Sequence, residues 1–141
     1  MLPDMMSKLR KSLVKHEDER SFPYVDSLGN ITIGIGYNLS ARGLSDTWIN
    51  NQFNEDVSYF YGCLSALPWF ASLNEDRKIV IVDMSFIGIK KLLTFTEMIA
   101  ALEKQDYEAA ANEMLNSEWA KEVKGRATDL AQGMRLGVYN V

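Results

Sequence analysis

Apolar and polar residues recur with two different periods along this chain, and each period predicts a different kind of element. Near the N-terminus, Leu9, Leu13 and Glu17 follow one another at i, i+4 and i+8, which predicts a helix over residues 7–17 with Ser7 as its N-cap. Further on, three isoleucines alternate with small or polar residues over 31–36, a strand pattern that follows the turn signal Leu28-Gly29-Asn30. A β-hairpin over about residues 22–37 is therefore expected.

From Ser45 onward the spacing is helical and stays so to the end of the chain. Ser, Asn, Thr or Asp residues precede most of the periodic segments, and these side chains are candidate N-caps. The expected helices cover about residues 45–66, 74–86, 94–104, 106–115, 117–123 and 126–136. The run 79–82 is apolar on every side, so the helix over 74–86 should be the buried central one. A mainly helical α+β fold with one small sheet follows.

Composition excludes several classes of protein. The chain has 141 residues, of which 47% are hydrophobic and 24% charged, a balance typical of one globular domain. Cys63 is the single cysteine and His16 the single histidine, so no internal disulfide can form and neither a metal site nor a cofactor is expected. The net charge of −4 argues against a nucleic-acid partner. No segment approaches the ~20 apolar residues of a membrane span, and no signal peptide is evident, which predicts synthesis in the cytoplasm and no stable membrane association.

Glu17 is the first candidate for chemistry. It shares a helix stripe with Leu9 and Leu13, so the helix should direct it inward, and it lies in the last turn, where the helix dipole is negative. Burial and the dipole would both raise the pKa of its carboxyl group. A carboxylic acid that is still protonated near neutral pH can protonate a leaving group. The alternative is an ordinary surface glutamate at a helix end.

Asp26 and Thr32 are the next candidates. Asp26 precedes the hairpin turn, where an aspartate most often bonds its own backbone. Thr32 shares its strand face with Gly34 and Gly36, so its hydroxyl should stand on a nearly bare strip where a polysaccharide could lie. The alternative for that strip is a loosely packed edge strand. Together with Glu17 these residues suggest a glycosidase, because two carboxylates that flank a glycosidic bond suffice for its hydrolysis.

The spacing of these residues resembles the phage-type lysozymes, the endolysins of tailed phages. The segment from Glu17 to Gly36 carries the catalytic spacing Glu-(8 residues)-Asp-(5 residues)-Thr-Ile-Gly-Ile-Gly. Further blocks in the family's order extend the resemblance over about residues 9–138: Gln52–Val57, Ser72–Phe86, Phe95-Thr96, Tyr107–Ala110, Trp119 and Gly125–Ala127.

The resemblance implies a lysozyme-like α+β architecture with an interlobe cleft. A small hairpin lobe would cover about residues 18–55, and a helical lobe about 60–141 together with the N-terminal helix. The implied activity is hydrolysis of the β-1,4 bond between N-acetylmuramic acid and N-acetylglucosamine in peptidoglycan, with inversion at the anomeric carbon. Glu17 matches the general acid, and Asp26 and Thr32 match the residues that position the attacking water. The expected substrate contacts are Gly34, Gly36, Tyr37, Phe86 and Arg126.

Three features depart from the family pattern. Asp18 stands where a glycine commonly follows the catalytic glutamate, and its carboxylate would raise the pKa of Glu17 if it faced the cleft. Asp83 stands where the family usually has asparagine; it interrupts an apolar helix and needs a partner, for which Arg126 is the candidate. The family also places that arginine against the catalytic glutamate, where it would lower the pKa. Finally, the chain is acidic, whereas many lysozymes are basic.

Two other functions remain open. A lytic transglycosylase would use one carboxylate and no water, which the presence of both Asp26 and Thr32 disfavours. A wall-binding or inhibitory module would use the fold without catalysis. By analogy with endolysins we expect a monomer that acts on peptidoglycan glycan strands, stays in the host cytoplasm, and needs a holin pore to reach the periplasm and cell wall.

Overall fold

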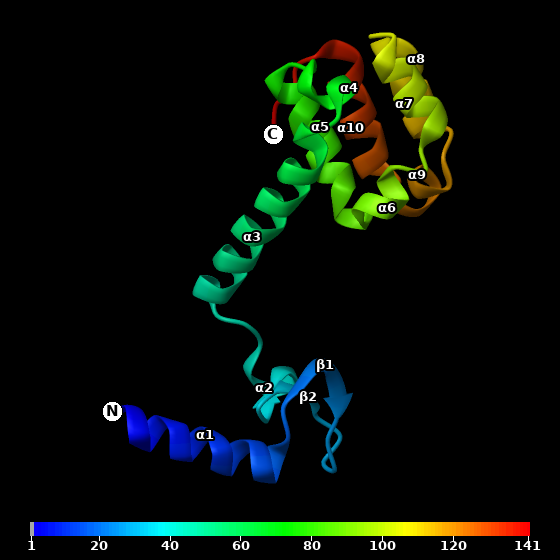
Figure 1. Ribbon diagram of the computed structural model, residues 1–141. Coiled ribbons are helices and arrows are strands. Elements are labelled where there is room, and N and C mark those ends of the chain that lie inside the picture. Colours follow the sequence, from blue (N-terminus) through cyan, green and yellow to red (C-terminus); the bar gives the residue numbers. More distant parts are fainter. Residues whose placement is uncertain (1) are drawn as a thin grey trace. The chain divides into compact units, whose positions relative to one another are not determined.

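The computed structural model describes residues 2–141, and Figure 1 shows the order of its helices and strands. It divides into two compact units, Met1–Gln52 and Phe53–Val141, with the boundary inside the long helix α3, Asp46–Ser65. Each unit is described on its own. The chain is mainly helical with one small antiparallel sheet, which confirms the α+β class. The lobe boundaries expected from the sequence stay a prediction.

The first unit begins with α1, Pro3–Glu17, which starts earlier than the sequence predicts. Leu2 is the N-cap residue and Pro3 occupies the first helical turn, so the expected cap at Ser7 is wrong. Proline suits this position because its φ is already helical and its missing N–H would have no partner there. No residue of α1 is buried, and Leu9 and Leu13 are 45% and 42% exposed.

Three antiparallel strands form the sheet in the order β1-β2-β3, with β1 at Arg20–Val25, β2 at Ile31–Gly34 and β3 at Tyr37–Asn38. The expected strand pattern over 31–36 is wrong beyond Gly34. Gly34 and Gly36 have φ values of +68° and +66°, so the chain turns there instead of continuing the pleat. Glycine is the residue that adopts this backbone without steric cost. The short helix α2, Leu39–Arg42, follows β3.

The second unit is helical throughout. After α3 come α4 at Pro68–Ala71, α5 at Glu75–Met84, the 3₁₀ turn η1 at Ser85–Ile87, α6 at Ile89–Leu92, α7 at Thr96–Glu103, α8 at Tyr107–Leu115, α9 at Glu118–Val123 and α10 at Gly125–Leu136. Helix α10 packs against both α8 and α5 (Figure 1).

Side-chain caps start three of these helices, two of them at residues that the sequence predicts, Asn74 and Asp106. Asn74, Asp106 and Ser117 each accept a hydrogen bond from a backbone N–H three residues ahead. Thr94 does not cap α7, because its hydroxyl donates to the carbonyl of Lys91 at 2.6 Å and the helix starts two residues later. Local cap chemistry therefore sets the starts of α5, α8 and α9, whereas α4, α6, α7 and α10 begin without a side-chain cap.

The apolar core lies in the second unit, between Leu64 and Met134. Val80 and Ile81 of α5 are fully buried, as expected for the central helix, but Ile79 is 45% exposed, so the prediction of all-round burial is wrong at that residue. Trp119 is buried at 1% exposure. In the first unit, over residues 2–52, Thr32 is the one buried side chain. No helix among residues 2–141 has both the length and the apolar character that crossing a membrane demands.

Candidate active site

Glu17 is the last residue of α1, and it lies against the turn that joins β2 to β3. A Cβ atom built on Gly36 would come within 2.9 Å of the Glu17 Cγ and 3.1 Å of its Cδ. Tyr24 of β1 donates its hydroxyl hydrogen to the backbone carbonyl of Glu17 at 3.3 Å. Glu17 itself is exposed, so the burial expected from its helix stripe is not observed. In the first unit this side chain therefore contacts the β2–β3 turn at Gly36 and does not lie in an apolar interior.

Asp18 ends α1 with an unusual backbone conformation, φ 69° and ψ 172°, which glycine adopts far more readily than other residues. Its backbone N–H donates to the carbonyl of Val14 at 2.9 Å. Its carboxylate accepts the backbone N–H of Glu19 at 2.8 Å and Nε of Arg20 at 3.3 Å. The Glu19 N–H, and after it the Arg20 guanidinium, hold the pKa of Asp18 below its usual 3.8. The carboxylate that the sequence places beside Glu17 thus has its own partners at the start of β1.

Asp26 organises the turn between β1 and β2. Its Oδ1 accepts two backbone N–H groups, from Leu28 at 2.9 Å and Asn30 at 2.8 Å, and the Asn30 side-chain amide lies 3.5 Å from Oδ2. These hydrogen bonds, with the Asn30 N–H as the largest contribution, lower the pKa of Asp26 from its usual 3.8. The structural role anticipated for a turn aspartate is therefore present. Since Oδ1 carries both backbone bonds, Oδ2 is the oxygen better placed to meet a water.

Thr32 lies beside Asp26 in this hairpin. It pairs with Tyr24 of β1 and with Asn38 of β3, and its side chain is only 4% exposed. Its hydroxyl donates to the carbonyl of Asn30 at 3.1 Å, and Thr32 is near enough to Asp26 to add a small contribution to the lowered pKa of that carboxyl group. The expectation that Thr32 stands on an open strip is wrong, because strands on both sides enclose it while Ile31 is 46% exposed.

A pocket of about 490 Å³ lies beside the start of β1, the end of β2 and Tyr37 of β3. Two residues expected to contact substrate, Gly34 and Tyr37, line it, and the Tyr37 hydroxyl donates to the Gly43 carbonyl at 2.5 Å while the Arg42 guanidinium stacks on its ring. The other lining residues are Arg20, Ser21, Ile33, Leu39, Leu44, Ser45 and Trp48. Sequence reasoning missed most of these, although Trp48, which is 48% exposed, stands in the first turn after the expected cap at Ser45.

The remaining two predicted residues, Phe86 and Arg126, lie in the second unit. Phe86 is 45% exposed in η1, and its ring packs edge-on against Phe60 with 5.0 Å between centroids. Arg126 donates from Nε to Oδ1 of Asp83 at 2.9 Å and from Nη2 to the same oxygen at 2.6 Å. The partner that the sequence predicts for Asp83 is confirmed.

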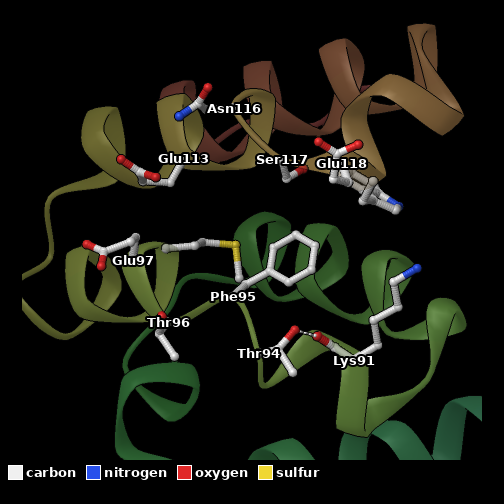
Figure 2. A pocket seen from close by; sticks show the side chains of 11 residues that line it. Lys91, Thr94, Phe95, Thr96, Glu97, Glu113, Asn116, Ser117 and Glu118 are labelled. Carbon is white, nitrogen blue, oxygen red and sulfur yellow. Dashed lines mark hydrogen bonds between the residues drawn. The ribbon is translucent and has the colours of Figure 1, made fainter.

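A separate pocket of about 320 Å³ lies in the second unit between the α6–α7 segment and the α8–α9 segment (Figure 2). Phe95 and Trp119 form part of its wall, and Glu97, Glu113, Glu118 and Lys91 also line it. None of the residues that the sequence analysis expects to act in catalysis or to contact substrate lines this pocket. Among residues 2–141, no group of three or more His, Cys, Asp or Glu side chains is arranged to hold a metal ion.

Comparison with known proteins gives one informative relative. No protein-family model matches the chain. A protein of Dictyostelium discoideum described as "Probable T4-type lysozyme 1" is 23% identical over 167 aligned positions, which cover 96% of this chain and 98% of the relative. The alignment is longer than the 141-residue chain, so it contains gaps where the relative has residues that this chain lacks. The chain is therefore similar, along nearly its whole length, to a T4-type lysozyme, in agreement with the resemblance of its motifs to the phage-type lysozymes.

Proposed function

We propose that this chain is a lysozyme that hydrolyses the β-1,4 bond between N-acetylmuramic acid and N-acetylglucosamine in peptidoglycan. The full-length similarity to a T4-type lysozyme supports the enzyme class. The observation that carries the proposal is the arrangement of three residues around one small sheet. Glu17 lies against Gly36, just beyond the end of β2, and at the start of the same strand Asp26 and Thr32 are both hydrogen-bonded to Asn30.

Glu17 acts as the general acid in this proposal. It gives its proton to the glycosidic oxygen as the bond to the anomeric carbon breaks, so the leaving sugar departs as a neutral alcohol. Its exposure at the end of α1 leaves the carboxyl group accessible to a polymeric substrate.

Asp26 and Thr32 direct the water. The hydrogen bonds that lower the pKa of Asp26 favour its ionised form, so its Oδ2 can accept the proton that the water loses as its oxygen bonds to the anomeric carbon. The Thr32 hydroxyl donates to the Asn30 carbonyl, and its oxygen can still accept a hydrogen bond. Attack on the face opposite the leaving group inverts the anomeric centre, for which we expect the Glu17 and Asp26 carboxyl groups to stand about 6.5–9.5 Å apart.

The products of the reaction test this proposal. Purified protein is incubated with isolated peptidoglycan, and the fragments are analysed by mass spectrometry and by NMR of freshly formed reducing ends. Hydrolysis with inversion yields reducing muramyl ends of α configuration. Anhydro-muramyl ends would show a lytic transglycosylase instead. Failure to clear outer-membrane-stripped cells at every value between about pH 4 and pH 9 would leave only a wall-binding role.

We further propose that the enzyme is an endolysin, which remains in the host cytoplasm as a monomer until a holin opens the inner membrane. Support comes from the motif resemblance alone, because the relative belongs to an amoeba. Expression in Gram-negative cells tests whether lysis depends on permeabilisation of the inner membrane. Lysis only after a holin or chloroform permeabilises the inner membrane supports the endolysin role, whereas lysis without either contradicts holin dependence.

A further inference from the structure

Gly36 makes a closer contact with Glu17 than a residue with a side chain could. An added Cβ would lie 2.9 Å from the Cγ, 3.0 Å from the Cβ and 3.1 Å from the Cδ of Glu17. A separation of 2.9 Å essentially never occurs at a real Cβ, and the other two are tighter than most real contacts, so either Glu17 or the turn would have to move. The whole aliphatic stem of Glu17 thus lies on the bare backbone of Gly36.

We propose that Gly36 is a positioning residue for the acid Glu17. Its bare backbone forms the surface, called the seat below, on which the Glu17 side chain rests. This inference rests on the role proposed for Glu17, and it assigns Gly36 a task besides any contact with substrate. The β2–β3 turn presents a flat backbone surface against which the stem of Glu17 rests, so the turn sets where the carboxyl group points.

The seat matters because nothing else described in the first unit confines this side chain. Glu17 is exposed at the end of α1, and the hydrogen bond from Tyr24 holds its backbone carbonyl, not its carboxyl group. A free glutamate side chain samples many rotamers, and a displacement of about 1 Å at a catalytic group can cost on the order of 10²-fold in rate. A fixed wall at Gly36 removes most of those rotamers before substrate binds.

The same unit offers a matched control for the effect of backbone strain. Gly43 also has a positive φ, +58° against +66° at Gly36, but a Cβ added there would meet no atom within 4 Å. Alanine at either position is strained by the backbone conformation, and only alanine at position 36 would also displace Glu17.

The first experiment compares Gly36→Ala with Gly43→Ala. Both should lose some thermal stability. With rates normalised to the folded fraction, Gly36→Ala should lose about 10- to 100-fold in kcat and shift the alkaline limb of its pH–rate profile, because the acid has moved. Gly43→Ala should keep its kcat within about threefold and its pH profile unchanged. A Gly36→Ala protein that retains both kcat and the wild-type pH profile overturns the proposal.

A double-mutant cycle shows whether Gly36 acts through Glu17. In a Glu17→Gln background, adding Gly36→Ala should lower the residual rate by less than about threefold, because the group that Gly36 seats is already disabled. If Gly36→Ala lowers the rate as much in that background as in the wild type, Gly36 acts on the substrate or on the fold, and the proposal is wrong.

Nuclear magnetic resonance provides a readout that does not depend on activity. A nuclear Overhauser effect between the Glu17 γ protons and the Gly36 α protons is expected in the wild-type protein, and its absence overturns the seat even if the enzyme is active. If the contact is observed but Glu17→Gln retains full activity, the proposed function of Glu17 fails instead, and the two failures are distinguished. Because it uses the wild-type protein, this measurement tests the Glu17–Gly36 contact even if Gly36→Ala does not fold.

Discussion

Arg126 donates three hydrogen bonds to Asp83. Nε and Nη2 both donate to the carboxylate Oδ1, and Nη2 also donates to the Asp83 backbone carbonyl at 2.9 Å. These hydrogen bonds connect the first turn of α10 to the end of α5. The side chains are 44% and 35% exposed, so the pair is neither fully screened by water nor buried at a large desolvation cost.

Removing the charge of Asp83 is expected to weaken the second unit. Asp83→Asn should lower the free energy of unfolding by about 1 kcal/mol, because charge-assisted hydrogen bonds to the guanidinium become neutral ones. Denaturant unfolding monitored by circular dichroism measures this. Glu118→Gln is the matched control, since Glu118 pairs with Lys121 where both side chains are largely exposed, and it should leave the stability unchanged. Equal effects of the two substitutions would show that the Asp83–Arg126 pair contributes no more to the free energy of unfolding than an exposed ion pair does.

Glu17→Gln is expected to lower kcat/KM for peptidoglycan by about 10²–10⁴, because the isosteric amide cannot protonate the leaving oxygen. Turbidity loss of outer-membrane-stripped cells gives the rates. Glu19→Gln makes the same chemical change two residues away, in a side chain that pairs with Arg10, and should stay within about twofold of the wild type. A Glu17→Gln rate within tenfold of the wild type would remove Glu17 from the role of general acid.

The low pKa of Asp26 links the hairpin to pH. Since the folded pKa lies below the unfolded value of 3.8, the native state is stabilised above that pH, and this stabilisation is lost as pH falls through the lowered value. The melting temperature of Asp26→Asn should therefore depend less on pH than that of the wild type between about pH 5 and pH 2. Titration of the Asp26 carboxyl carbon by NMR should give a midpoint below 3.8, and a midpoint above it would contradict the hydrogen bonds described here.

Asp18 occupies a backbone conformation that costs a residue with a side chain roughly 1–3 kcal/mol. Asp18→Gly removes this strain but also removes the bonds to Glu19 and Arg20, so we expect a net rise in melting temperature of about 2–4 °C. Asp18→Ala keeps the strain and loses the bonds, and it should lower the melting temperature. A glycine variant that melts no higher than the alanine variant would show that the conformation carries no cost.

Local chemistry allowed the sequence alone to determine much of this molecule. Asn74 and Asp106 cap their helices as predicted, because a side-chain oxygen needs only the N–H groups of the next turn. The hairpin turn at Asp26 was equally readable, since its hydrogen bonds span four residues at most. The cost of an unpaired charge beside a core helix predicted that Asp83 has a partner, and Arg126, the candidate, is that partner.

Only the tertiary structure decided the features that depend on distant neighbours. The alternation of isoleucines over 31–36 favours a longer strand, but the positive φ values at Gly34 and Gly36 end β2 and return the chain as β3. That return encloses Thr32 between two strands, which its own sequence context does not indicate. It also brings Gly36 against Glu17, nineteen residues earlier in the chain, and no periodicity within α1 or the hairpin could predict that contact, because it arises from how one element packs on another.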